Sequence, residues 1–80
     1  MLIDLKFENI GRNKANFTKM NYTSKSDDYI DIDYDFLYNS VKPYILSNDI
    51  DFYLDKKNPN IIKVFAGFYC VGKIKIIRKK

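Results

Sequence analysis

The chain has 80 residues and a mass of 9.5 kDa, which supports a single small domain over residues 1–80 and excludes a large cofactor fold. Apolar residues make up 46% and charged residues 30%, so the chain should fold. No apolar run approaches ~18 residues, so we expect no membrane-spanning helix and no membrane partner. A charged start unlike a signal peptide and a single Cys, which allows no internal disulfide, favour a cytoplasmic location.

The expected elements begin with strands. Residues 2–10 alternate between apolar and polar side chains, which predicts a half-buried strand. Residues 15–23 read as a second strand of less regular pattern, because Lys19 interrupts its apolar face and Tyr22 falls on the opposite face. Residues 29–34 alternate again and predict a third strand.

After this third expected strand, the period of the apolar residues changes. Leu37 and Val41 fall at helical spacing, and Asp33 or Asp35 could cap a helix. Pro43 inside a helix removes one hydrogen bond and clashes with the preceding turn, at about 3 kcal/mol. The helix should therefore kink at Pro43 or give way to a second short turn that this proline opens.

Three further strands are expected, at residues 50–55, 61–66 and 70–78, with Gly67 and Gly72 marking a turn or a bulge. The predicted order is βββ-α-βββ. Its short loops indicate an α+β fold with a single small antiparallel sheet, of about five to six strands, and one helix packed on a face.

The net charge of +4 hides a segregation along the chain. Residues 1–26 hold five basic and two acidic side chains, residues 27–55 hold eight Asp against one Lys, and residues 56–80 hold eight basic side chains and no acid. This pattern is the most informative feature of the sequence, since it suggests charged partners or charged self-assembly.

The acidic segment supplies the candidate partner-binding residues. On a strand, alternate carboxylates would share one face at roughly 6–7 Å, close to the phosphate spacing of a nucleic-acid strand. Such a row could occupy a basic groove that normally holds DNA or RNA; a solvated sheet face is the plainer explanation. A Ca²⁺ loop is disfavoured, because its central Gly and distal Glu are missing. The residues are Asp27, Asp28, Tyr29, Asp31, Asp33 and Asp35.

The basic C-terminal segment supplies an alternative nucleic-acid-binding set, because basic side chains contact phosphates and the aromatic residues among them can stack on bases. Lysines that guard a sheet edge are the plainer explanation. Phe68 and Tyr69 could project at a hairpin tip or be buried, and Cys70 should be a small buried residue. The set is Lys63, Lys73, Lys75, Arg78, Lys79 and Lys80.

Catalysis is disfavoured by composition. The chain has no His, which excludes a Ser-His-Asp arrangement and imidazole acid–base chemistry. No Ser lies in a nucleophile elbow. We therefore expect no enzyme, no metal and no cofactor.

Several features are typical of one class of protein: a short chain, residues with A/T-rich codons, no catalytic motif and segregated charge. In character the chain resembles the small proteins of phages and mobile elements, anti-CRISPR proteins among them, although no aligned residues carry the likeness. The resemblance implies a non-catalytic inhibitor that binds a host protein or ribonucleoprotein defence complex in the host cytoplasm, with the acidic face as a nucleic-acid mimic. The residues leave two alternatives: a small basic nucleic-acid-binding protein, and a homodimer that pairs acidic with basic segments.

Overall fold

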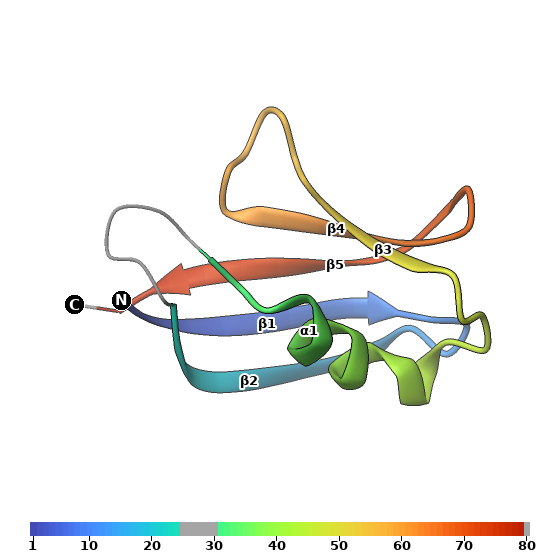
Figure 1. The fold of residues 1–80 in the computed structure, drawn as a ribbon, viewed down its shortest axis with the longest axis horizontal. Helices are drawn as coiled ribbons and strands as arrows, with labels where there is room; N and C mark the ends of the chain where they lie inside the picture. Colours follow the sequence, from blue (N-terminus) through green and yellow to red (C-terminus); the bar gives the residue numbers. More distant parts are fainter. Residues whose placement is uncertain (25–30, 80) are drawn as a thin grey trace.

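A computed structural model describes residues 1–24 and 31–79. Its elements are β1 (Leu2–Ile10), β2 (Ala15–Thr23), α1 (Tyr34–Val41), the 3₁₀ helix η1 (Lys42–Tyr44), β3 (Ile50–Leu54), β4 (Ile61–Ala66) and β5 (Tyr69–Arg78). The strands form one antiparallel sheet of order β2-β1-β5-β4-β3. The expected α+β class, with one antiparallel sheet and one helix, is confirmed (Figure 1).

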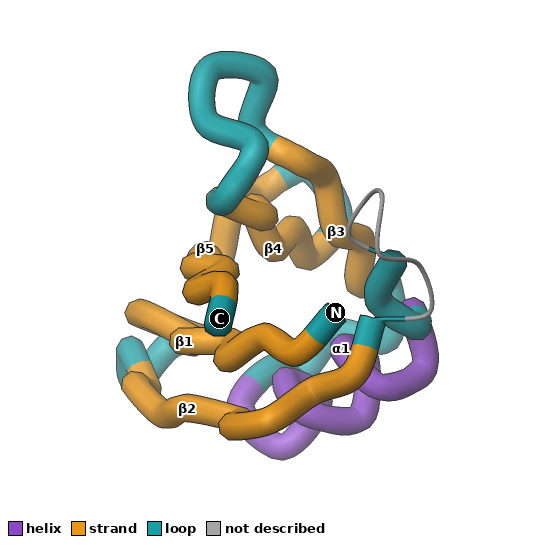
Figure 2. The backbone as a smooth tube through the Cα atoms, turned by 90° about the vertical axis from the view of Figure 1, so that its left-hand side faces the viewer, coloured by secondary structure: helices purple, strands orange, loops and turns teal. Residues whose placement is uncertain are grey.

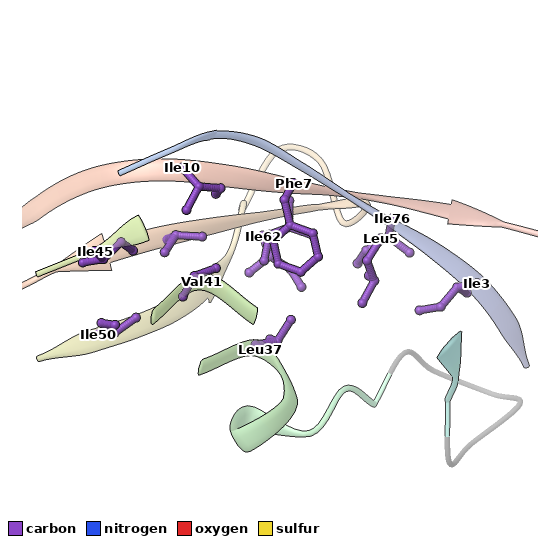
Figure 3. Close-up of a cluster of buried hydrophobic side chains, with 12 residues drawn as sticks. Ile3, Leu5, Phe7, Ile10, Leu37, Val41, Ile45, Ile50, Ile62 and Ile76 are labelled. Carbon is purple, nitrogen blue, oxygen red and sulfur yellow. The ribbon is translucent and has the colours of Figure 1, made fainter. Parts of the chain in front are cut away.

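The sheet is curved, and α1 lies on its concave side (Figure 2). Alternation along β1 points Ile3, Leu5 and Phe7 into that concavity, where each is fully buried. Leu37 and Val41 of α1 pack against the same cluster, so the helical spacing in the sequence marked the buried side of the helix (Figure 3). No described element covers the convex face, which is therefore open to solvent.

Aromatic contacts hold the helical segment across the concave face. Phe17 of β2 stacks between Phe7 and Tyr44, with ring centroids 4.5 and 5.0 Å away, and so ties η1 to the β1–β2 hairpin. At the other edge of the sheet, the ring of Tyr34 meets Phe52 of β3 edge-on at 5.5 Å. The helix is thus fixed at both edges, which leaves the convex face as the free side of the sheet.

The prediction of a third strand at residues 29–34 is wrong for the residues of this span that the structure describes, 31–34. Residues 31–33 have no regular structure, and Tyr34 begins α1. Asp33 caps this helix, because its carboxylate accepts a hydrogen bond from the N–H of Asp35 at 3.2 Å. A helix cap and a strand can both place a polar residue next to an apolar one in the sequence. In this segment Asp33 acts as the cap of a helix, and no strand forms over the described residues. The first two residues of that span lie outside the described residues.

The break at Pro43 follows the second of the two expectations. α1 ends at Val41, and η1 begins at Lys42 with Pro43 in its opening residues. In the first turn of a helix a backbone N–H has no acceptor within that helix, so the missing N–H of Pro43 costs no helical hydrogen bond there. The chain then turns back toward β3.

A bulge in β2 corrects the expected position of Tyr22. Ile3 lies opposite Tyr22 and Leu5 opposite Lys19, so β2 has one residue more than β1 over this step. Asn21 has a φ of 60°, the left-handed conformation that absorbs the extra residue. Tyr22 is thereby turned to the core side, where it packs partly buried.

The β4–β5 hairpin bears out the expected glycine roles. Gly67 lies in the turn, and Gly72 lies at the irregular step of β5. Phe68 and Tyr69 project at the tip, with 98% and 78% of their surfaces exposed. Cys70 follows them and is also exposed, so its expected burial is wrong, because it precedes the part of β5 that lines the core.

Gly11 in the β1–β2 turn should not tolerate a side chain. Its φ is 75°, and a Cβ would lie 1.9 Å from the carbonyl oxygen of Tyr44. We expect Gly11→Ala to lower the free energy of unfolding by about 2–4 kcal/mol, from left-handed strain plus the steric overlap. Urea unfolding followed by circular dichroism measures this loss.

Gly67→Ala is the matched control. Its φ of 62° imposes the same kind of strain, but its Cβ would meet nothing closer than Asp49 Oδ2 at 4.0 Å. This variant should lose only about 1 kcal/mol. Equal losses in the two variants would contradict a role for the Tyr44 contact.

Candidate functional site

The acidic candidates do not form the expected row of carboxylates. Asp33 and Asp35 lie at the start of α1, where negative charge stabilises the helix N-terminus. Asp31 precedes the helix, and its N–H donates to Ser24 Oγ at 2.9 Å. The strand face predicted for these three side chains is therefore wrong. Asp27, Asp28 and Tyr29 lie outside the described residues.

The basic candidates, by contrast, meet on the convex face of the sheet. Lys63 of β4 lies directly opposite Lys73 of β5, and Lys75 of β5 lies directly opposite Lys6 of β1. Like charges in directly opposed positions destabilise an antiparallel pair. Lys6 was missed from the sequence, because its place beside β5 depends on the pairing of the two ends of the chain.

One carboxylate serves three of these lysines. Glu8 Oε1 lies 3.6 Å from Lys75 Nζ and 3.9 Å from Lys73 Nζ, and Glu8 Oε2 lies 4.0 Å from Lys6 Nζ. These distances allow attraction but no hydrogen bond, and Oε1 has no hydrogen-bond partner among the described residues although it is buried. We call Lys6, Lys63, Lys73 and Lys75 the lysine cluster. With Glu8 beside it, this cluster keeps an excess of positive charge and has no well-formed ion pair.

The remaining basic candidates lie apart from this cluster. Arg78 lies two residues after the buried Ile76 and so shares its face of β5, which is opposite to the face of Lys75. Lys79 Nζ lies 3.2 Å from Asp4 Oδ1 and donates to Asn21 Oδ1 at 2.6 Å, so it is engaged at the far end of β1. Lys80 is outside the described residues.

An aromatic hollow adjoins the lysine cluster. Tyr53 of β3 lies directly opposite Lys63, and its ring meets that of Phe65 at 5.5 Å and 79°. These side chains and the turn residues Lys56 and Lys57 line a hollow of about 590 Å³. Its volume is in the range of sites that take organic ligands, roughly 300–1,000 Å³. Tyr53 was not a sequence candidate, and Lys56 and Lys57 were counted in the basic C-terminal segment but not in the candidate set, since no local pattern places these residues beside Lys63.

Asp55 shapes the turn that borders this hollow. Its Oδ1 accepts the N–H of Lys57 at 2.8 Å, and its Oδ2 lies 3.7 Å from Lys63 Nζ. The Lys57 hydrogen bond lowers the pKa of the Asp55 carboxyl against the opposing effect of burial, and the charge of Lys63 adds to the lowering. Lys56 and Lys57 form no ion pair with other described residues, so both ammonium groups are available to an anion.

The described residues contain no group of three or more His, Cys, Asp or Glu arranged to hold a metal ion. Nor does that part of the chain contain a helix long and apolar enough to cross a membrane. Comparison with protein-family models, curated proteins and solved structures found no match to this chain. The function must therefore be inferred from the chemistry of the convex face.

Asp4 should make the fold sensitive to acid. Its carboxylate accepts the N–H of Asn21 at 2.9 Å, and this hydrogen bond, with help from Lys79, lowers the pKa of Asp4 below its ordinary value of 3.8. The stabilisation is complete above pH 3.8 and is lost as the pH falls through the lowered pKa. We expect Asp4→Asn to be less stable at neutral pH and to lose less stability on acidification, as measured by urea unfolding across this range.

The Lys79→Met substitution distinguishes the contributions of the two partners to the pKa of Asp4, because it removes Lys79 and keeps the Asn21 hydrogen bond. Because the Asn21 hydrogen bond is the larger cause of the lowered pKa, this variant should keep most of the acid dependence. An Asp4→Asn protein with the acid dependence of the parent would contradict the assignment.

Proposed function

We propose that this chain binds single-stranded nucleic acid on the convex face of its sheet. The observation that carries the proposal is the placement of two neighbouring aromatic rings, Tyr53 and Phe65, beside opposed lysines on a face that no described element covers. Proteins that bind single strands without a base code combine such cations, which follow the backbone, with rings on which bases stack.

The lysine pairs support phosphate as the ligand. Lys63 opposite Lys73 and Lys75 opposite Lys6 weaken the sheet, and Glu8 neutralises only part of their charge. Residues that cost stability without a structural gain are typical of functional surfaces. A phosphate between two opposed ammonium groups would relieve the repulsion, because neighbouring strands are only about 4.8 Å apart.

The aromatic hollow supports a single strand over a duplex. The base of an unpaired nucleotide can leave its neighbours and lie against Tyr53, whose surface is 56% exposed, whereas a base inside a duplex cannot. The cations are lysines, which act as point charges and lack the planar fork with which Arg reads guanine. We therefore expect weak sequence preference.

The first test measures binding of fluorescein-labelled oligo(dT) and oligo(U) by fluorescence anisotropy, from about 50 mM salt upward. Tyr53→Leu/Phe65→Leu keeps apolar bulk but removes both rings, and should weaken binding at least about tenfold, since stacking is worth about 1–3 kcal/mol per base. Lys56→Ala/Lys57→Ala should reduce the slope of log K against log salt by about 1.4, or 0.7 for each lost phosphate contact.

Arg12→Ala/Lys14→Ala is the matched control for charge, because it removes two cations from the β1–β2 turn, away from the hollow. It should leave the salt slope unchanged. No binding at about 50 mM salt, or an equal loss in this control, would overturn the proposal. Thermal unfolding of each variant establishes that the fold is retained.

Glu8→Gln should strengthen binding of the same oligonucleotides. The substitution removes the carboxylate that competes with phosphate for Lys6, Lys73 and Lys75. Affinity should rise about two- to fivefold at low salt, while the free energy of unfolding falls by about 1 kcal/mol, because the opposed lysines lose their shared counter-ion. Asp31→Asn makes the same charge change before α1 and should leave affinity unchanged; weaker binding by a folded Glu8→Gln protein would contradict the interpretation.

Two expectations from the sequence stay predictions. One is inhibition of a host defence complex by acidic mimicry, for which Asp31, Asp33 and Asp35 form no row of carboxylates on a strand, because Asp31 precedes α1 and the other two lie at its start. Charge-driven homodimerisation is likewise untested. The proposed nucleic-acid interface differs from both in that all the side chains on which it is argued belong to the described residues.

A further inference from the structure

Three loops meet at the end of the molecule opposite the N-terminus: the β1–β2 turn, the segment after η1 and the β4–β5 turn (Figure 1). The described apolar side chains with the largest exposed fractions lie in or next to two of these loops. They are Phe68 at 98%, Leu46 at 89% and Tyr69 at 78%. We call Phe68, Tyr69 and Leu46 the apolar tip.

Hydrogen bonds hold these loops together. The N–H of Gly67 donates to the carbonyl of Asp49 at 2.9 Å, which joins the β4–β5 turn to the segment that carries Leu46. The N–H of Gly11 donates to the carbonyl of Val71 at 2.8 Å, which joins the β1–β2 turn to β5. The Leu46 carbonyl itself accepts from Lys42 Nζ at 3.3 Å. The apolar tip is thus presented by a fixed framework, and its exposure does not come from a loosely held loop.

Cations flank the apolar tip. Arg12 and Lys14 of the β1–β2 turn line a hollow together with Cys70 and Val71, which directly follow Tyr69. Both cations are exposed, and neither forms an ion pair with another described residue. Asp49 is the only acidic residue in these three loops, which the structure describes in full, against the two cations Arg12 and Lys14, so cations outnumber anions in the loops at this end.

We propose that this end of the molecule docks on an anionic lipid surface. The apolar tip would enter the interfacial layer, where aromatic side chains are favoured, and Arg12 and Lys14 would contact lipid phosphates. The shape of the tip argues for lipid, because a side chain that protrudes with 98% of its surface exposed needs a matching cavity in a protein partner but none in a bilayer. The proposal departs from the sequence-based expectation of no membrane partner, which stays untested, because the tip is assembled from segments distant in the chain.

The test uses Phe68→Trp, which introduces the sole Trp of the chain and so reports on one position. Vesicles of phosphatidylcholine with phosphatidylserine should shift its emission to the blue and carry the protein into the pellet. Vesicles of phosphatidylcholine alone should do so far more weakly, because Arg12 and Lys14 then lack anionic lipid. An emission maximum that stays constant with the anionic vesicles overturns the proposal.

Three further variants identify the surface that meets the lipid. Phe68→Ser/Tyr69→Ser should lower the partition coefficient onto anionic vesicles, measured by pelleting, about tenfold or more, since burial of an aromatic side chain contributes more than one decade of affinity. Met20→Ser is the matched control, because Met20 is 65% exposed on β2, and should change little. Lys56→Ala/Lys57→Ala should also pellet normally. Pelleting that depends on Lys56 and Lys57 but not on Phe68 would show that the convex face binds the vesicles, and would overturn the proposal.

Discussion

The pairing of the first strand with the last is the interaction on which the rest of the structure depends. β1 and β5 run antiparallel at the centre of the sheet, with Phe7 opposite Ile74 and Glu8 opposite Lys73. Because successive side chains point to opposite faces, this register builds the core on one side and the charged surface on the other. The same hydrogen bonds therefore specify the hydrophobic core and the candidate interface.

This pairing also redistributes the charge that is segregated along the chain. The basic C-terminal strand lies between β1 and β4, so Lys73 and Lys75 approach Glu8, while Lys63 approaches Asp55. The result is a surface on which cations outnumber carboxylates, in place of separate acidic and basic halves. Because its ion pairs are long and the lysines in them are about half exposed, the face can exchange them for phosphate at small cost.

Local patterns predicted most of the elements, and their failures have physical causes. β1, β3, β4 and β5 were readable because burial of one face imposes a period of two. The prediction of a strand at residues 29–34 failed, since the capping residue Asp33 produces the same alternation of polar and apolar residues as a strand. The bulge at Asn21 was not readable, because the N–H of that residue is satisfied by Asp4 on the neighbouring strand. The lysines of β4 and β5 could be proposed as a set, but Lys6 and Tyr53 could not.

By itself, the sequence determined the α+β class, the inward face of most strands, an irregularity of the helix at Pro43 and the lack of imidazole chemistry. These follow from residue type and short-range spacing, which act within a few residues of the chain. Only the tertiary structure decided which strands are neighbours, and with that the opposition of Lys63 to Lys73 and the meeting of Tyr53 with Phe65. It likewise decided that the apolar tip forms at one end. Both surfaces join residues far apart in sequence, and their proximity depends on the packing of the whole sheet, which no local pattern encodes.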